Sequence, residues 1–458
     1  MARDYDENEQ RRRRRAAQKR KKQEEQALRR KLIIAGVIFI ACIVLVIFLT
    51  RDNVPEETLP ENMEIQTEQT LPDFTERATL PPETPTTTIR IKAAGDLNVT
   101  DKVVAAGASG YGDEYYDYTA AFLDVASLLS DADLTLMNFE GNLVGPPYGT
   151  DTASAPQQLV QALNAIGVDI LQVANSYSTY NGMIGLAQTL NNIRAAGIEP
   201  IGAYATPDEF RQSRGYTICD IRGVKVAVVA FTKGMGGLGL PEGSENCVNK
   251  LFVDYDSEYK KIDYDGIRSI LKNLRSEKPD VTIAMLHWGA EYNDTIFKSQ
   301  KDIAELMIDE GVDIILGTHS HMVHELVFDK ENNTVIAYSL GDFFGDAAKA
   351  GTNYSILLDI QVTKDNELGT IKIDSVNHIP LYILKENESN GQRRVVRIHE
   401  AMDAYDVNFV DKVTKEAYDA MVNSLERIEA RIDPAAWAAK QEALKKAAEE
   451  AAKETTAP

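Results

Sequence analysis

Histidines and carboxylates follow short apolar runs in this sequence. Asp96 and Glu140 each come after such a run, and His287, His319 and His321 close or follow two later runs. Imidazole and carboxylate together suit zinc, manganese or iron, and a His-x-His pair leaving a strand can direct both rings into one crevice. The alternative is that the histidines only satisfy loop backbone groups, with the acids serving turns or helix caps. The joint occurrence of all five favours a divalent-metal site.

Such a site needs strands that end at one edge. The β-rich runs of the chain cover 88–94, 134–138, 170–174, 224–231, 281–287, 313–316 and 335–340. Helical patterns at 185–196 and 264–276 separate several of them, and this alternation predicts an α/β domain with buried strands. Open α/β sheets bind ligands beyond the carboxyl ends of their strands. Later runs at 356–362, 371–376 and 393–398 leave no room for helices and predict an antiparallel addition to the sheet.

The N-terminal region predicts a membrane anchor. Residues 32–49 carry no charge, and this segment is long enough for a helix to cross the bilayer. We assign 32–50 to a transmembrane helix. Lys and Arg cluster before this segment, so residues 1–31 are expected in the cytoplasm and the main domain outside the cell. A cleaved signal peptide is the alternative, but its apolar region usually spans only about 7–15 residues and ends in a small-x-small site.

The rest of the chain divides by composition. The predicted parts are a disordered Thr/Pro/Glu stalk at 51–88, a folded domain at 89–400, a helical extension at 401–433 and an Ala/Lys/Glu-rich tail at 434–458. Cys219 and Cys247 are the two cysteines beyond the membrane helix, and their spacing does not indicate whether they are bonded.

The charge balance bears on partners. The chain has 70 acidic and 49 basic residues, a formal charge of -21. An acidic surface disfavours nucleic acid and other polyanions. The basic tail lies beside the predicted membrane helix, where Lys and Arg are attracted to anionic lipids, so membrane lipid is the expected partner of that segment.

Six ordered motifs carry a resemblance. They read Gly95-Asp96, Asn138-Phe139-Glu140, Ala174-Asn175, His287-Trp288-Gly289-Ala290-Glu291-Tyr292, Gly317-Thr318-His319-Ser320-His321 and Tyr338-Ser339-Leu340-Gly341-Asp342-Phe343. Together they resemble the capsule-synthesis CapA family, which is associated with poly-γ-glutamate production. The resemblance implies a calcineurin-like metallophosphatase α/β sandwich whose strand-end loops hold one or two divalent metals. It also implies that the five residues named above are the metal ligands.

The third motif departs from the family pattern. Ser176 and Tyr177 stand where the resemblance implies an Asn ligand and a His general acid, and Asp342 replaces an Asn. Serine is a poor ligand, and tyrosine, with an ordinary pKa near 10, donates protons slowly compared with imidazole. A site for a single metal, with Asn175 or Asp342 as an additional ligand, is the expectation.

Two functions stay open at this point. One is a cell-envelope enzyme, a metal-dependent hydrolase or transferase that serves synthesis, export or anchoring of a capsule-like polymer such as poly-γ-glutamate. The other is a non-catalytic module with a decayed metallophosphatase site that binds the polymer or scaffolds membrane-bound polymer synthesis proteins.

Overall fold

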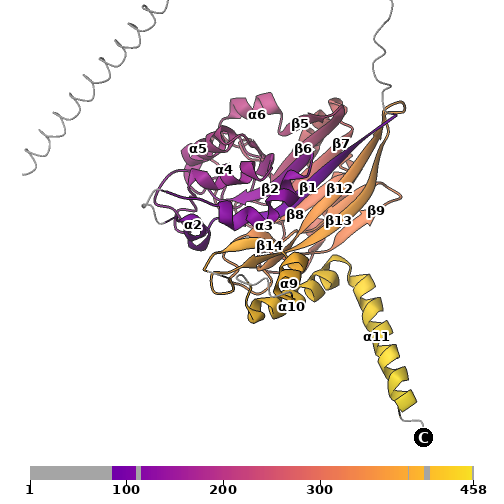
Figure 1. The fold of residues 1–458 in the computed structure, drawn as a ribbon. Coiled ribbons are helices and arrows are strands. Elements are labelled where there is room, and N and C mark those ends of the chain that lie inside the picture. The colour runs from indigo at the N-terminus through magenta and orange to yellow at the C-terminus, as the bar shows by residue number, and fades with distance from the viewer. Residues whose placement is uncertain (1–84, 110–114, 390, 407–412, 456–458) are drawn as a thin grey trace, which may run out of the picture. The chain divides into compact units, whose positions relative to one another are not determined.

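The computed structural model describes residues 85–109, 115–389, 391–406 and 413–455 (Figure 1). The predicted cytoplasmic tail, the transmembrane helix at 32–50 and nearly all of the stalk lie outside these ranges. Within them, no helix is both long and apolar enough to cross a membrane.

One mixed sheet runs through the first and last parts of the described chain. In spatial order, its strands are β14 (Arg394–Arg397), β13 (Ile371–Leu384), β12 (Tyr354–Asp365), β1 (Thr86–Asn98), β2 (Leu134–Glu140), β3 (Ile170–Gln172) and β4 (Glu199–Ile201), with β11 (Asp342–Phe344) also paired to β1. The strands from β1 to β4 are parallel, whereas β12 is antiparallel to β1, β13 to β12 and β14 to β13. The predicted antiparallel addition is therefore confirmed.

A second mixed sheet is formed by the middle of the chain. In spatial order, its strands are β5 (Tyr216–Ile221), β6 (Val224–Thr232), β7 (Val281–His287), β8 (Ile314–Thr318), β10 (Thr334–Ala337) and β9 (Leu326–Asp329). Its inner strands are parallel, and the outermost strand at each edge is antiparallel to its neighbour.

Helices connect and cover these strands. They are α2 (Asp101–Gly107), α3 (Thr119–Ser130), α4 (Gln157–Ala165), α5 (Gly182–Ala195), α6 (Pro207–Ser213), α7 (Tyr264–Ser276), α8 (Lys298–Asp309), α9 (Ile398–Asp406), α10 (Lys415–Ile432) and α11 (Pro434–Thr455). The predicted helix at 264–276 has the bounds of α7, and the one at 185–196 corresponds to α5.

The two sheets share a hydrophobic core. Along β6, Val226 and Val228 face the core shared with the first sheet, whereas Ala227 and Val229 face a second core with α7 and α8. Both faces of this strand are covered, which explains its continuous apolar sequence. The predicted α/β class is confirmed as an α/β fold with mixed sheets.

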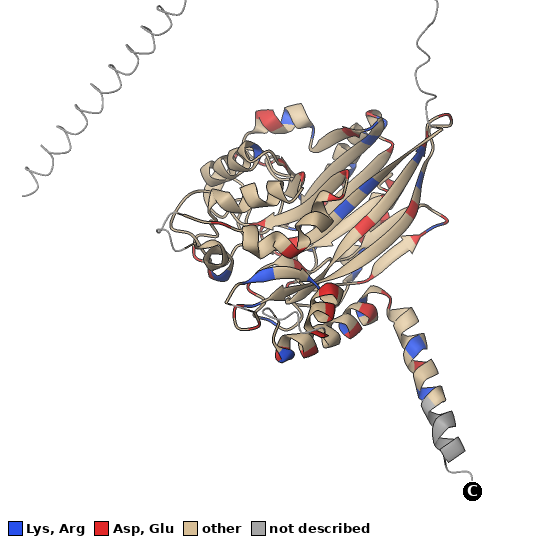
Figure 2. Cartoon of the chain, viewed as in Figure 1, with Lys and Arg blue, Asp and Glu red and all other residues tan. Residues whose placement is uncertain are grey.

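Charged residues alternate with core residues along the long strands of the first sheet. Figure 2 shows acidic and basic residues interspersed over β1, β12 and β13, and Arg90 of β1 binds Asp359 of β12 through its Nε at 2.7 Å. The first strand also begins earlier than predicted. Thr86 and Thr87 pair with Asp365 and Lys364 of β12, so the folded domain takes residues that composition assigned to the stalk.

Candidate metal centre

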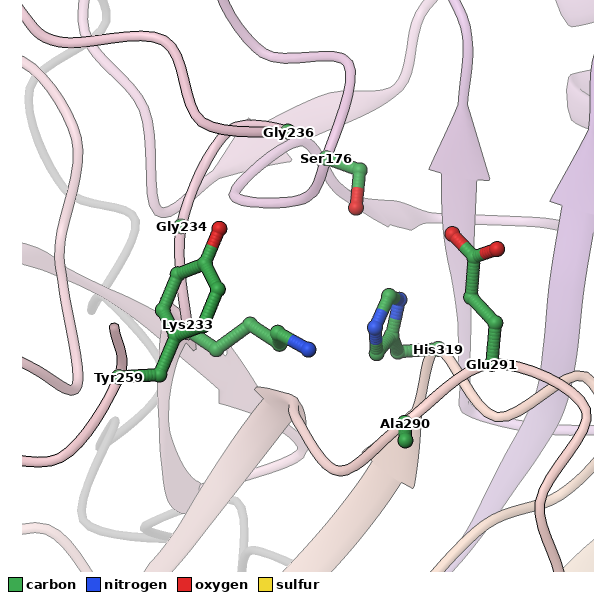
Figure 3. A pocket seen from close by; sticks show the side chains of 8 residues that line it. All are labelled: Ser176, Lys233, Gly234, Gly236, Tyr259, Ala290, Glu291 and His319. Atoms are coloured by element: carbon green, nitrogen blue, oxygen red, sulfur yellow. The ribbon is translucent and has the colours of Figure 1, made fainter. Parts of the chain in front are cut away.

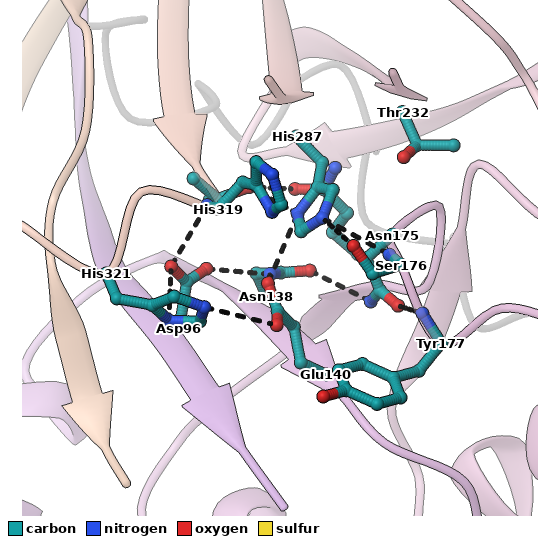
Figure 4. Close-up of polar contacts among 12 residues, drawn as sticks. Asp96, Asn138, Glu140, Asn175, Ser176, Tyr177, Thr232, His287, His319 and His321 are labelled. Carbon is teal, nitrogen blue, oxygen red and sulfur yellow. Dashed lines mark hydrogen bonds and ion pairs between the residues drawn. The ribbon is translucent and has the colours of Figure 1, made fainter. Parts of the chain in front are cut away.

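The predicted metal ligands meet where strands of both sheets end (Figure 4). Asp96 and Glu140 come from β1 and β2 of the first sheet, and His287 closes β7 of the second. His319 and His321 follow β8. The five residues arrive from four strands far apart in sequence and lie in direct contact, as the distances below show.

The buried ligand atoms form two adjoining groups. Glu140, His287 and His319 make one group, and Asp96, His321 and Asp342 make the other, with the atoms of each within 4.8 Å of one another. Histidine and carboxylate oxygen and nitrogen atoms at this spacing can coordinate one ion. Their role as ligands stays a prediction.

Glycines let the elements approach closely enough to build the second group. A Cβ on Gly95 would lie 1.8 Å from the carbonyl oxygen of Gly341, and this same oxygen accepts the backbone N–H of Asp96 at 2.9 Å. The contact sets β11 beside β1, with Asp342 in register with Asp96. Any side chain at position 95 would push these two carboxylates apart.

The histidine loop after β8 has an unusual backbone. His319 and His321 have φ values of 88° and 59°, in a region that residues with a Cβ seldom adopt. The loop is held by Asp96, whose Oδ2 accepts the His319 N–H at 3.0 Å, and by a 2.7 Å contact between His321 Nδ1 and Asp342 Oδ1. Backbone strain of this kind concentrates at functional sites.

Three carboxylates crowd around one cationic histidine. Burial raises the pKa of Asp96 to about 6 and that of Glu140 well above its usual range. Burial works to lower the pKa of His321, but the Asp342, Glu140 and Asp96 carboxylates outweigh it and raise that pKa well above the ordinary value. The cluster therefore has a deficit of positive charge that a divalent cation would relieve.

The other two histidines are suited to bind metal. Burial lowers the pKa values of His287 and His319 well below the ordinary range, so both rings are neutral at pH 7. His319 Nδ1 is buried and has no hydrogen-bond partner among the described residues. A buried ring nitrogen without a partner is costly unless something binds it, so this atom fits a metal ligand.

An amide pair organises the floor of the site. Asn138 Nδ2 donates to Asp96 Oδ1 at 2.7 Å and to Glu140 Oε1 at 3.1 Å, and Asn175 Nδ2 donates to Asn138 Oδ1 at 3.1 Å. Asn175 Oδ1 in turn accepts the backbone N–H of Tyr177 at 3.0 Å. Of the two additional candidates, Asp342 thus joins a ligand group, whereas Asn175 is engaged in orienting the loop.

Ser176 and Tyr177 occupy the degenerate part of the site. His287 Nε2 accepts the backbone N–H of Ser176 at 3.2 Å and contacts its Oγ at 3.1 Å, while His287 Nδ1 lies 3.2 Å from Glu140 Oε1. The backbone contact occupies the Nε2 lone pair, so His287 would ligate an ion through this atom only once the Ser176 N–H has moved away. Burial, with nearby carboxylates, raises the pKa of Tyr177 to about 12, which makes its hydroxyl a still poorer acid.

Two residues of the site escaped the sequence-based prediction. Asn138 was taken only as part of a motif, and Lys233, which lines a pocket beside His319, was not singled out. Lys233 directly follows β6, so the strand-end rule that selected His287 would also have selected it.

The family of the chain follows from its sequence once this site is in view. Residues 90–347, more than half of the chain, match the family described as bacterial capsule synthesis protein PGA_cap. The chain belongs to this capsule synthesis family. All six residues of the two ligand groups lie inside the matched segment.

Named relatives share this segment. The chain is 29% identical over 225 residues to the capsule biosynthesis protein CapA of Bacillus anthracis, a match that covers 49% of this chain and 50% of the relative. It is 25% identical over 249 residues to the PGA biosynthesis protein CapA of Bacillus subtilis, covering 53% and 59%. The match thus spans between half and three fifths of these relatives.

Two solved structures with some likeness are a phosphoesterase and a phosphatase. The calcineurin-like phosphoesterase YfkN of Bacillus subtilis aligns with a TM-score of 0.38 at 16% identity, over 75% of this chain and 97% of that one. A phosphatase of Mycoplasma pneumoniae aligns with a TM-score of 0.39 at 14% identity, over 64% and 93%. Both scores are below 0.5.

Proposed function

We propose that this chain is a membrane-anchored accessory protein for the synthesis, export or anchoring of a capsule-like polymer such as poly-γ-glutamate. The family match and the names of the relatives support this role. The uncharged segment at 32–49 and the basic residues before it support a single-pass anchor with the main domain outside the cell. Its partners are membrane lipid, the envelope polymer and membrane-bound polymer synthesis proteins.

The proposal includes a divalent metal, zinc, manganese or iron, in a metallophosphatase-like site. The observation that carries it is that two groups of buried ligand atoms lie side by side. Their carboxylates include Asp96, whose pKa burial raises, and their histidines include His319, whose Nδ1 has no hydrogen-bond partner among the described residues. The residues that would hold the ion are those of the two groups: Asp96, Glu140, His287, His319, His321 and Asp342. A divalent metal polarises phosphoryl or acyl oxygens, which is the chemistry of a hydrolase or transferase.

The chain's own residues prepare this site. Asn138 holds the Asp96 and Glu140 carboxylates in place through its Nδ2, and the loop after β8 is fixed by Asp96. Tyr292 stacks on the His321 ring, with centroids 5.1 Å apart, and shields that ring from solvent. Preorganised ligands of this kind reduce the cost of binding the ion.

A second candidate function is a polymer-binding or scaffolding module without catalysis. The observation that favours it is the pair Ser176 and Tyr177: the serine backbone engages His287 Nε2, and the half-buried tyrosine stands in place of an imidazole acid. In this case the metal site would serve binding alone, or would be a remnant.

Metal content tests the first proposal. In the full chain, His319→Ala combined with His321→Ala removes one ligand from each group, so metal affinity should fall about 100-fold or more. The measurement is elemental analysis after dialysis against metal-free buffer, followed by titration with zinc and manganese. A matched control, His378→Ala with His399→Ala, removes two histidines of β13 and α9 and should keep the metal.

The outcomes separate the two candidates. Metal retained by the wild type and lost by the site variant, together with hydrolysis of a phosphodiester or γ-glutamyl substrate, supports the enzyme. A metal-free wild-type chain that takes up neither ion overturns the metal site. Metal binding without hydrolysis in a broad screen favours the binding module.

A further inference from the structure

A pocket of about 250 Å³ opens beside the candidate metal centre and shares His319 with it. Its other ionisable side chains include Lys233, which follows β6, and Glu291, which follows β7. In Figure 3 the Lys233 ammonium and the Glu291 carboxylate lie on opposite sides of the His319 ring. The pocket therefore presents one cation and one anion to whatever occupies it.

Lys233 is fixed in position without a carboxylate partner. Its Nζ donates to the carbonyl oxygen of Gly289 at 2.7 Å and lies 4.8 Å from the centre of the Tyr259 ring. In the described ranges, no carboxylate oxygen comes within 4.0 Å of Lys233 Nζ, the distance that defines an ion pair. Burial lowers the pKa of Lys233, and the charge of Glu291 partly offsets that effect. A half-buried ammonium with unused N–H groups is ready to receive an anion.

Glu291 provides the complementary charge. It is exposed and lies on the loop after β7 whose Gly289 carbonyl anchors Lys233, so both charges are set by the same loop. The two side chains influence each other electrostatically but do not form an ion pair within 4.0 Å. A ligand that satisfies both must itself carry a negative and a positive group.

We propose that this pocket binds an amino-acid residue with a free α-ammonium and a free carboxylate, the carboxylate on Lys233 and the ammonium on Glu291. This inference rests on the proposed function. In a γ-linked glutamate chain only the amino-terminal residue has both groups free, since interior residues have lost the ammonium to an amide bond. The pocket is smaller than the roughly 300–1,000 Å³ typical of ligand sites, which suits one residue rather than a stretch of polymer.

Calorimetric titration of the full chain with γ-linked diglutamate and its N-acetylated form tests the proposal. Wild type should bind the free amine about 10-fold or more tightly than the acetylated form, because acetylation removes the charge that faces Glu291. Lys233→Met should weaken both ligands about 10-fold or more. Glu291→Gln should abolish the difference between the two ligands. Lys301→Met and Glu305→Gln, exposed on α8, are the matched controls and should behave as wild type.

The affinities of the two ligands for the wild type and the variants decide whether the proposal holds. Equal binding of the two forms by wild type, or a silent Glu291→Gln, overturns the proposal in favour of a simple anion site, and failure to bind either ligand overturns it entirely. If free glutamate binds as tightly as diglutamate, the same site takes the monomer. If diglutamate binds more tightly, the site takes the end of a chain. Metal analysis of the same samples keeps the proposals apart: a metal-loaded chain without amine discrimination sinks only this one.

Discussion

Aspartates precede several parallel strands of both sheets, other acidic residues gather where β1 and β2 end, and the two sets play different roles. At the amino ends, one aspartate stands immediately before each of four strands: Asp133 before β2, Asp169 before β3, Asp280 before β7 and Asp313 before β8. Each carboxylate accepts a backbone N–H from the neighbouring strand, at 2.7 to 2.8 Å. These acids complete the hydrogen bonding of the sheet.

At the carboxyl ends, the acids face one another instead. Asp96, Glu140 and Asp342 share one buried space, where burial raises the pKa of each carboxyl. Such an arrangement costs stability unless a cation binds, which is the usual relation between a functional site and its scaffold. Acidic residues before the strands therefore stabilise the sheets, whereas those gathered beyond β1 and β2 prepare a site.

The largest expected effect on stability is at an amino end. Asp280→Ala removes the acceptor for Lys225 N and the ion-pair partner of Lys364, both at 2.7 Å. Leaving the Lys225 N–H unpaired should lower the free energy of unfolding by about 2 kcal/mol, measured by urea denaturation. Metal content should not change. Asp309→Ala, at the exposed end of α8, is the control and should stay within about 0.5 kcal/mol of wild type.

A substitution at the carboxyl ends should act in the opposite direction. Glu140→Gln removes a buried carboxylate whose pKa burial has raised, so the chelator-treated chain should gain about 1 kcal/mol in free energy of unfolding while its metal affinity falls. Glu310→Gln is the matched control. That carboxylate pairs with Arg268 and Arg275, so its loss should give no gain. A destabilised Glu140→Gln would contradict the contrast between the two ends.

The sequence could reveal this contrast only in part. Strand-end reasoning found Asp96, Glu140 and the histidines because polar residues after buried runs are visible in one dimension. It could not assign strands to sheets, since a strand such as β6 is apolar on both faces and shows no alternation of apolar and polar residues. The amino-end aspartates look like ordinary loop residues until the neighbouring strand is known.

Short and local details were also beyond the sequence. Strands β4 and β11 are three residues long, and each exists only because an adjacent strand supplies its hydrogen bonds. The engagement of Asn175 by Asn138, and of Ser176 by His287, depends on loops brought together by tertiary packing. Residue type alone therefore left the additional ligand open between Asn175 and Asp342.

The last expected effect concerns pH at an amino end. Burial raises the pKa of Asp313 to about 6, against a partly opposing hydrogen bond from Thr282 N at 2.8 Å. Because this pKa is above the ordinary value of 3.8, the folded state holds the proton more tightly than the unfolded state. The resulting stabilisation is complete below about pH 4 and is lost as pH rises through 6.

Asp313→Asn keeps an acceptor for Thr282 N but cannot ionise, so its stability should depend less on pH. Between pH 4 and pH 7 the wild type should lose about 1 kcal/mol more than the variant, a value reduced from the full shift because Asp313 is only half-buried. Urea denaturation with chelator present at each pH measures the difference and keeps the metal centre out of the comparison. Parallel curves would show that burial at this amino end costs Asp313 nothing. Asp313 would then differ fully from the crowded carboxylates of the metal centre. The predicted difference in pH dependence would instead mean that even a hydrogen-bonded aspartate before a strand bears part of the cost of burying a carboxylate.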